Sequence, residues 1–417
     1  MTTHEAVKQI CAKAKAASVG LAALNTKQKN SILASIKALL WDNRESIISA
    51  NQKDLSAAQT NGVPAPMLDR LLLNEQRLLG ICSSLDSLIS LPDPVGSGEV
   101  FTTAGGLEIC CERVPLGVVA IIYEARPNVT VDAAALCLKT GNAVVLRGGR
   151  EASNTNIELV RIMKNAIESC GISPDTLGFV QSGEGHESAN ALMSMRGLVD
   201  VLIPRGSARL IRSVVDNAKV PVIETGAGNC HLYIDESADT DMAVNVAVNA
   251  KCSRPAVCNA IETMLVHSSL AEKFLPEFAK AAQSYSLEIR GCERTRNILP
   301  TAKAATEEDF ETEYDDLIIA VKIVDSVDEA IAHINKYNTG HSEAIITNSQ
   351  SNANKFRKYV DAAAVYVNAS TRFTDGGEFG FGAEIGISTQ KLHARGPMGL
   401  KALTTQKYLI NGNGQIR

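Results

Sequence analysis

The stretch LGVVAIIYEARPNVTVDAAALCLKTGNAVVLRGG, residues 116–149, decides the fold. Its first part, LGVVAIIY at 116–123, is a continuous apolar run, which is typical of a parallel strand buried on both faces. The segment VTVDAAALCLKT at 129–140 reads as a helix that ends at Gly141-Asn142. AVVLR at 143–147 is then a second buried strand. The order strand, helix, strand predicts a parallel βαβ unit with a right-handed crossover.

The same alternation continues along the chain in two series, the second of which begins near residue 231. The further strands are predicted at 177–181, 199–203, 220–224, 231–235, 263–267, 317–324, 343–347 and 364–368. The further helices are predicted over 154–169, 208–217, 239–250, 270–284 and 327–337. The first 90 residues carry helical apolar spacing instead. The pattern predicts an α/β protein with two α/β domains, in which helices cover both faces of each sheet.

Composition limits the classes of partner and compartment. The chain of 417 residues has a formal net charge of −5, so no global positive field favours nucleic acid. No apolar stretch approaches the 18 residues that a membrane helix needs, and the N-terminus lacks the apolar segment of a secretory signal. The ten cysteines show no C-x-x-C spacing, which predicts free thiols and no metal site. We therefore expect a cytoplasmic protein with neither a nucleic-acid nor a membrane partner.

One cysteine lies in a loop suited to nucleophilic chemistry. Cys258 ends the run NAKCSRPAVC, after a predicted helix and just before the predicted strand at 263–267. Arg254 and the backbone N–H groups of such a loop would lower a thiol pKa and favour a reactive thiolate. Cys252 lies six positions earlier, and composition does not separate the two thiols. The residues alone leave open that either cysteine is buried and inert.

Glycine-containing turns follow three predicted strands. Ligands of open α/β sheets bind at strand carboxyl ends, where helix N-termini offer free N–H groups to phosphate. The pattern G-x-G-x-x-G is absent, so ordinary strand-to-helix turns explain these glycines as well as a nucleotide site does. The turns are Arg147-Gly148-Gly149-Arg150, Ser182-Gly183-Glu184-Gly185 and Arg205-Gly206-Ser207.

Arginines recur in predicted loops. Arg126 follows a strand in YEARPN, Arg372 lies in a glycine-rich loop, and Arg395 lies in HARGP near the C-terminus. A guanidinium binds phosphate or carboxylate through two parallel hydrogen bonds, so these residues suit an anionic substrate. Surface ion pairs are the alternative for each of them. The sequence lacks H-E-x-x-H, G-x-x-x-x-G-K-[ST] and G-x-S-x-G, which argues against zinc hydrolases, P-loop kinases and serine hydrolases.

Several segments resemble one family over essentially the whole chain. They are YEARPNVTVD, LKTGNAVVLRGG, PVIETGAGNCHLYIDESAD, NAKCSRPAVCNAIETMLVH, YVNASTRFTDGGEFGFGAEIGIST and QKLHARGPMGL. They closely resemble the gamma-glutamyl phosphate reductase family, a branch of the aldehyde dehydrogenase superfamily. The resemblance implies NADPH-dependent reduction of L-glutamyl 5-phosphate to L-glutamate 5-semialdehyde and phosphate through a cysteine thioester, the second step from glutamate to proline.

The resemblance also implies an organisation and partners. An aldehyde-dehydrogenase-like fold would place a Rossmann-like NADP-binding domain at residues 1–225 and a catalytic domain at 226–395. Residues 98–112 would form an oligomerisation arm paired with the C-terminal strand, within residues 396–417. We expect a homo-oligomer, a dimer or a tetramer, with glutamate 5-kinase as a potential protein partner.

Site residues carry over position by position. The catalytic cysteine of the family falls on Cys258. Arg147 stands where the superfamily has a lysine at the adenosine ribose, and with Arg150 it suits a 2′-phosphate, so NADP(H) is expected over NAD. The other positions implied for the cofactor are Gly148, Gly149, Gly183, Gly185, Arg205, Gly206, Ser207, Glu224 and Glu313, of which Glu313 would bind the nicotinamide ribose. Arg126, Arg254, Arg372 and Arg395 are the pool for substrate phosphate and α-carboxylate.

Two departures from the superfamily keep alternatives open. The oxyanion-hole asparagine of hydrolytic members is replaced by Ala125, and Asn128 is the nearest substitute. Glu224 stands where oxidising members have the base that activates water, so an oxidising, thioester-hydrolysing dehydrogenase is one alternative. A scaffold or binding protein that keeps the fold without turnover is another.

Overall fold

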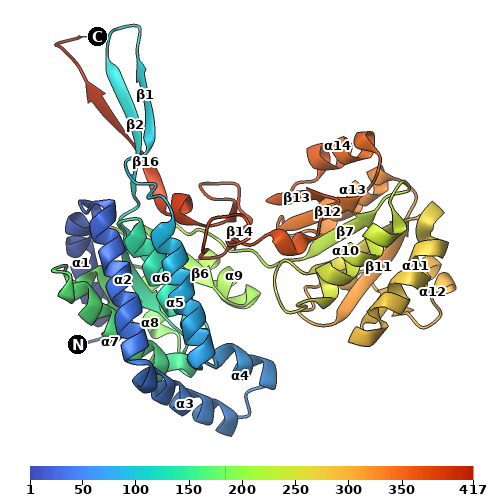
Figure 1. The fold of residues 1–417 in the computed structure, drawn as a ribbon, viewed down its shortest axis with the longest axis horizontal. Helices are drawn as coiled ribbons and strands as arrows, with labels where there is room; N and C mark the ends of the chain where they lie inside the picture. The colour runs from blue at the N-terminus through green and yellow to red at the C-terminus, as the bar shows by residue number, and fades with distance from the viewer. Residues whose placement is uncertain (184, 417) are drawn as a thin grey trace. The chain divides into compact units, whose positions relative to one another are not determined.

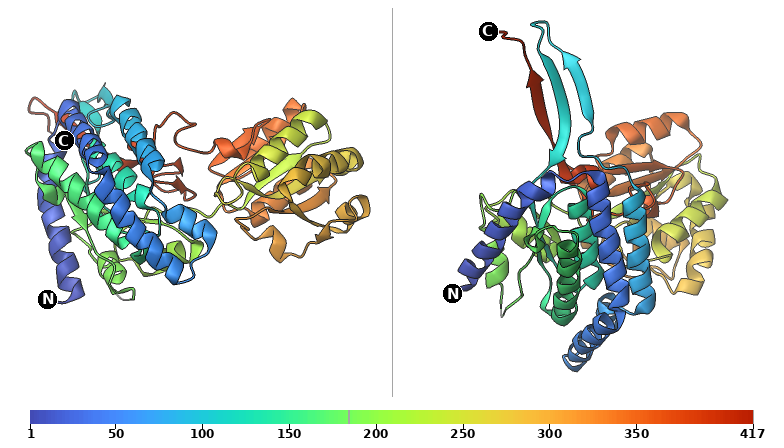
Figure 2. Two further views of the ribbon diagram at one scale, coloured as in Figure 1. Left: turned by 60° about the horizontal axis from the view of Figure 1, so that its bottom comes forward. Right: turned by 60° about the vertical axis from the view of Figure 1, so that its left-hand side comes forward.

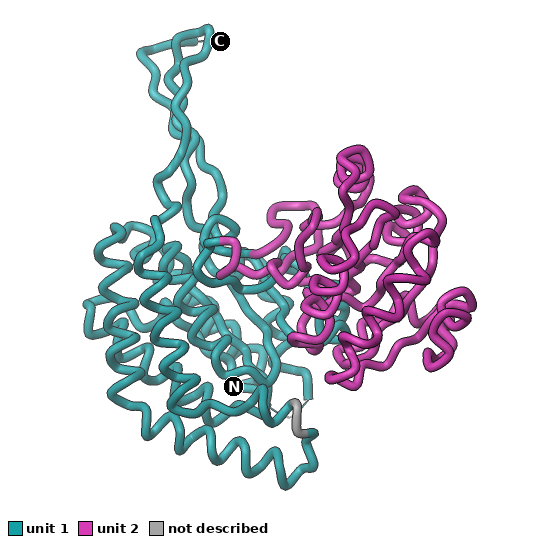
Figure 3. Tube along the Cα trace, turned by 45° about the vertical axis from the view of Figure 1, so that its right-hand side comes forward, with its two compact units in different colours: residues 1–224, 380–386, 398–417 teal, residues 225–379, 387–397 magenta. Residues whose placement is uncertain are grey.

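The computed structural model describes residues 1–183 and 185–416, which form two compact units (Figure 3). The first comprises residues 1–224, 380–386 and 398–417, and the second comprises 225–379 and 387–397. The prediction had placed 380–386 with the second domain. Backbone hydrogen bonds explain the difference, because Ile385 N donates to Met398 O at 3.1 Å and Met398 N donates to Gly386 O at 2.8 Å.

Helices fill the first 90 residues, as predicted, and begin at sequence-encoded caps. Thr2 and Glu5 form a reciprocal capping box at the first helix, and Asn25 and Gln28 form one at the second. The helices are α1 (Thr3–Ala22), α2 (Thr26–Asp42), α3 (Arg44–Thr60), α4 (Ala65–Leu71) and α5 (Glu75–Ser90).

The sheet of the first unit is parallel, with strand order β5-β4-β3-β6. All six residues of β3 are buried, as the continuous apolar run predicts. Helices α6 and α7 pack together on one side of the sheet, whereas α1 packs against β4 and β5 and also contacts α8. The elements are β3 (Val118–Tyr123), α6 (Pro127–Lys139), β4 (Ala143–Arg147), α7 (Ser153–Ser169), β5 (Leu177–Phe179), α8 (Glu187–Met193), β6 (Val201–Arg205) and α9 (Ala208–Asn217).

The strand predicted at 220–224 is wrong. Val222 forms only an isolated parallel bridge with Leu202 of β6. Pro221 accepts a hydrogen bond from Leu202 N through its carbonyl but has no N–H to donate, so the ladder cannot extend through it.

The second unit contains a seven-stranded parallel sheet with order β10-β9-β11-β8-β7-β12-β13. Helices α10, α11 and α12 pack in sequence, and α13 packs against α14. The segment with β9 and α12 was not predicted. The elements are β7 (Cys230–Ile234), α10 (Thr240–Cys252), β8 (Ile261–His267), α11 (Ser268–Ala282), β9 (Glu288–Gly291), α12 (Glu293–Ile298), β10 (Lys303–Ala304), β11 (Ile318–Val324), α13 (Val327–Tyr337), β12 (Ser342–Ile346), α14 (Gln350–Tyr359) and β13 (Ala364–Val367).

An antiparallel sheet projects from the helices of the first unit (Figures 1 and 2). Its strands are β1 (Gly98–Thr102), β2 (Glu108–Pro115) and β16 (Thr404–Asn411), with β2 in the centre. The predicted pairing of this segment with the C-terminal strand is confirmed, since β16 pairs with β2 from Thr404 opposite Pro115 to Asn411 opposite Glu108. Among the described residues, no helix is long and apolar enough to cross a membrane.

Candidate active site

Cys258 lies in a short loop of the second unit, between α10 and β8. It is half-buried, whereas the next two residues, Asn259 and Ala260, are buried. A hydrogen bond of 3.0 Å from Ala260 N to Val257 O closes a turn around the cysteine. The loop thus presents a thiol that is not in a disulfide, on a residue that is partly exposed.

The structure separates the two cysteines that composition could not. Cys252 is the last residue of α10 and is only 6% exposed. Burial raises the pKa of its thiol, so a nucleophilic thiolate is disfavoured there. Cys258 is therefore the better candidate for the nucleophile.

Gly228 packs closely against the backbone of Cys258. A Cβ atom built on Gly228 would lie 1.5 Å from the Cys258 carbonyl oxygen and 2.7 Å from its Cα, so only glycine fits. The Gly228 N–H donates to Glu313 Oε1 at 2.8 Å, and burial raises the pKa of that carboxyl group. Glu313 therefore contacts the backbone that lies against the nucleophile, while its predicted contact with the nicotinamide ribose stays a prediction.

Two arginines lie near the thiol. Arg372 Nε donates to Ser253 Oγ at 3.3 Å, and Arg372 also hydrogen-bonds Asn259 Oδ1. Burial and then the neighbouring charge of Arg254 lower the pKa of Arg372, whereas Cys258 raises it. The structure therefore brings Cys258, Arg254 and Arg372 together, and two guanidinium groups beside a thiol favour an anionic substrate.

The other two predicted substrate arginines are both exposed. Arg395 pairs with Asp361 at 2.7 Å, and Lys391 binds the same carboxylate at 2.5 Å, which is the surface ion-pair arrangement. Arg126 is exposed in the first unit, where it precedes α6. Substrate binding by either residue stays a prediction.

Asn128, the predicted oxyanion donor, lies in the first turn of α6 in the first unit. Its Nδ2 atom donates to Asp132 Oδ2 at 3.1 Å. Burial raises the pKa of Asp132 to about 6, although this hydrogen bond opposes the rise. The amide is thus engaged within its own helix, and its catalytic role stays a prediction. Glu224 is half-buried and is the last residue of the first unit's main segment, and its predicted role stays a prediction.

The turn after β4 offers groups that fit a nucleotide. Arg147 is half-buried and donates to Ser188 Oγ at 3.4 Å, and Arg150 is exposed. Asn156 on α7 accepts from Thr130 through Oδ1 at 2.7 Å, while its buried Nδ2 has no partner among the described residues. A Cβ on Gly148 would lie 2.3 Å from that Nδ2, so glycine leaves this donor room. Cations and a free donor at a strand carboxyl end fit the hydroxyl or phosphate oxygens of a dinucleotide.

The turn at Arg205-Gly206-Ser207 already holds an anion of the chain itself. The Glu124 carboxylate accepts from Ser207 N at 2.8 Å and from Ser207 Oγ at 2.9 Å, at the N-terminus of α9. A Cβ on Gly206 would lie 2.5 Å from Glu124 Oε2. An anionic group of the cofactor that bound at this predicted turn would therefore compete with Glu124. In the other predicted turn, Glu184 is outside the described residues, and open space surrounds Gly183 and Gly185.

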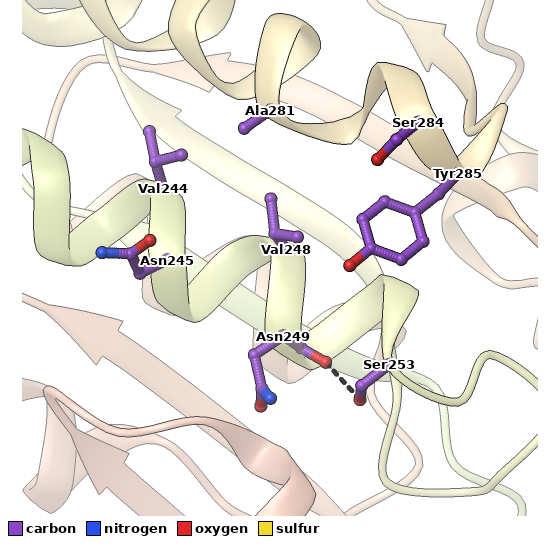
Figure 4. A pocket seen from close by; sticks show the side chains of 8 residues that line it. All are labelled: Val244, Asn245, Val248, Asn249, Ser253, Ala281, Ser284 and Tyr285. Atoms are coloured by element: carbon purple, nitrogen blue, oxygen red, sulfur yellow. Dashed lines mark hydrogen bonds between the residues drawn. The ribbon is translucent and has the colours of Figure 1, made fainter.

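A groove of about 400 Å³ borders the start of the cysteine loop (Figure 4). Val244 and Val248 on α10 point toward α11, and Ser253 forms one end. The lining consists of Val244, Asn245, Val248, Asn249, Ser253, Ala281, Ser284 and Tyr285. It contains no charged group and not the thiol, so the anion-binding features belong to the cysteine loop rather than to this groove.

Sequence reasoning missed the groups that act on these residues over long separations. The described structure adds Glu124, Asn156 and Asn259 to the neighbourhoods of the predicted positions. Locally, Glu124 and Asn259 are polar residues next to a predicted strand or site, and Asn156 is a polar residue near the start of a predicted helix.

Comparison with known proteins agrees with this geometry. The family model described as "Aldehyde dehydrogenase family" matches residues 1–315 and 298–408. The chain belongs to the aldehyde dehydrogenase family. It is 58% identical over 412 residues to gamma-glutamyl phosphate reductase of Carboxydothermus hydrogenoformans, covering 99% of each chain, and 56% identical over 406 residues to that of Clostridium perfringens strain 13, covering 97% of this chain and 98% of the relative.

A solved structure of a family member has the same fold. The crystal structure of gamma-glutamyl phosphate reductase from Thermotoga maritima matches with a TM-score of 0.96 at 47% identity, covering 99% of each chain. The predicted aldehyde-dehydrogenase-like α/β fold is therefore confirmed. Membership of this family implies a nicotinamide cofactor, which the turn after β4 fits.

Proposed function

We propose that the chain is a gamma-glutamyl phosphate reductase that converts L-glutamyl 5-phosphate to L-glutamate 5-semialdehyde and phosphate. The observation that carries the proposal is the accessible Cys258 thiol with Arg254 and Arg372 beside it. The relatives named above, at 56–58% identity over nearly full length, support the same activity. The arginines suit the phosphate and carboxylate of this substrate.

The chemistry of Cys258 follows from its sulfur. The thiolate attacks the acyl carbon of the substrate, the bond from carbon to the phosphate oxygen breaks, and phosphate leaves with the electron pair. The Cys258 backbone N–H donates to the carbonyl oxygen as negative charge develops on it. The cofactor, when bound, supplies the hydride that reduces the acyl carbon. The carbonyl of the aldehyde then forms as the bond between the acyl carbon and the Cys258 sulfur breaks, and the sulfur leaves as a thiolate.

Phosphate dependence tests the proposal against a hydrolytic dehydrogenase. In the reverse direction, glutamate 5-semialdehyde and NADP should give steady NADPH formation only when inorganic phosphate is present, because phosphate must accept the acyl group from Cys258. We expect the steady rate, measured by the absorbance of NADPH, to be about tenfold or more higher at saturating phosphate than without phosphate. An equal rate without phosphate would mean that water accepts the acyl group, and would restore the hydrolytic function suggested by Glu224.

The cofactor is proposed to be NADP(H), held by Arg147 and Arg150. Replacing both by Ala should raise KM for NADPH at least about tenfold while changing KM for NADH less than about threefold, since a lost phosphate contact costs about 1.5–3 kcal/mol. Steady-state kinetics with both cofactors measures this. Arg161→Ala is the control, because Arg161 lies on the adjoining helix α7 and pairs with Glu158. Equal changes for NADPH and NADH would remove the case for NADP.

The projecting sheet is proposed to join subunits. Its outer strands β1 and β16 each have one unpaired edge, and they expose apolar side chains such as Val100 at 65% and Ile410 at 58%. Ile410→Lys should shift the protein to a smaller assembly in light scattering at micromolar concentration. An unchanged mass of the Ile410→Lys variant would place the interface elsewhere. Docking of glutamate 5-kinase stays a prediction.

A further inference from the structure

Two buried charged residues bracket the loop that carries Cys258. Lys251 is the penultimate residue of α10, and Glu262 is the second residue of β8. Both residues are 0% exposed, and Lys251 Nζ lies 2.5 Å from Glu262 Oε2. Because the loop at 253–260 runs between them, this one ion pair joins its two ends.

Stability alone does not explain the ion pair. Removing two charges from water costs about as much free energy as their attraction returns, and apolar residues of similar size often replace such pairs without loss. Glu262 stands in a strand of which every residue except His267 is buried, and its Oε1 has no hydrogen-bond partner among the described residues. Burial raises the pKa of this carboxyl group to about 8, although Lys251 opposes the rise. Unlike an apolar contact, the hydrogen-bonded ion pair fixes both the distance and the relative orientation of the ammonium and carboxylate groups.

Contacts connect the ion pair to the backbone of the nucleophile. The Tyr314 ring centroid lies 5.9 Å from Lys251 Nζ. The preceding residue, Glu313, lies near enough to Glu262 to raise its pKa further, and it accepts the hydrogen bond from Gly228 N–H. Gly228 in turn lies against the Cys258 backbone. The ion pair of Lys251 and Glu262 therefore joins the two ends of the loop, and Gly228 packs against the loop backbone at Cys258.

We propose that Lys251 and Glu262 are positioning residues for the reaction, and that their ion pair holds the cysteine loop so that the Cys258 sulfur and backbone N–H meet the substrate carbonyl. This inference rests on the proposed function of Cys258 as the nucleophile. A displacement of about 1 Å at a reacting group lowers the rate by up to about 100-fold. Neither residue contacts the substrate in this account, and both act through the loop.

The test uses the full-length protein with the double variant Lys251→Met/Glu262→Met, and Glu262→Gln beside it as a variant that keeps the side-chain shape. We expect kcat of phosphate-dependent semialdehyde oxidation to fall at least about tenfold, with KM for NADP changed less than about twofold. Hydrogen–deuterium exchange should quicken in peptides that contain residues 253–260 and stay unchanged in peptides from the first unit. This second readout does not depend on catalysis, so it tests the inference even if the proposed function fails.

A matched control separates this role from the general effect of removing a buried ion pair. Lys29 and Asp93 in the first unit form a similarly buried pair, with side chains 2% and 6% exposed, that does not bracket the cysteine loop. Lys29→Met/Asp93→Met should keep kcat and loop exchange within about twofold of the parent protein. The inference is overturned if the Lys251 and Glu262 variants keep the parent kcat, if kcat falls without faster exchange in the loop, or if the control pair lowers kcat to the same extent.

Discussion

Cys258→Ser should lower kcat by at least about 10⁴-fold while leaving folding and cofactor binding intact. The hydroxyl of serine is far less ionised than a thiol at neutral pH and is a poorer leaving group, so both formation and release of the acyl-enzyme suffer. Losses of this order follow removal of a catalytic nucleophile in other enzymes. Initial rates of semialdehyde oxidation, with thermal unfolding and cofactor titration on the same sample, measure the effect.

The control for this experiment is supplied by the chain itself. Cys252→Ser removes a thiol six positions away that is buried at the end of α10. It should keep kcat within about threefold and lose only a modest part of the free energy of unfolding. If Cys252→Ser were inactive and Cys258→Ser were not, the nucleophile would be misassigned.

Gly228→Ala should be the most damaging substitution outside the nucleophile. The added Cβ would lie 1.5 Å from the Cys258 carbonyl oxygen, so one of the two backbone segments must move. Overpacking of a rigid site costs about 1–3 kcal/mol, and the displaced loop should lower kcat at least about 100-fold. Denaturant unfolding and steady-state kinetics measure the two effects separately.

A glycine with free space around it provides the comparison for that variant. Gly80 lies inside α5, and a Cβ built there meets nothing within 4 Å. Gly80→Ala should therefore stabilise the protein by about 0.5–1 kcal/mol with unchanged kcat. A Gly228→Ala variant with parent-like kcat would show that the loop does not depend on its contact with Gly228.

The sequence predicts the parts of this molecule that depend on local pattern. The apolar run at 118–123 is the fully buried strand β3, and the helix predicted over 327–337 is α13. The strand predicted at 220–224 fails at Pro221, where one residue without a backbone N–H limits pairing to a single bridge. The loop of Cys258 is likewise local, because a helix and a strand define its ends.

The contacts that give the site its chemistry are not local. Glu313 meets Gly228 across 85 positions, and Glu124 meets Ser207 across 83. No spacing rule predicts such pairs, because the sheet topology creates them. The choice between Cys252 and Cys258 has the same origin, since it follows from which thiol the packing of α10 buries. The buried Glu262 does leave a local signal in the sequence, namely a glutamate inside the largely apolar run IETMLVH.

Covalent acylation of Cys258 is the central claim, and mass spectrometry tests it directly. The protein is mixed with glutamate 5-semialdehyde and NADP in the absence of phosphate, quenched in acid within milliseconds to seconds, and digested with trypsin. Cys252 and Cys258 share one tryptic peptide when the Arg254-Pro255 bond resists cleavage, so fragment ions between the two cysteines assign the modified sulfur. We expect a glutamyl adduct on Cys258 that disappears when phosphate is added. An adduct on Cys252, or NADPH formation with no adduct on either sulfur, would contradict the account.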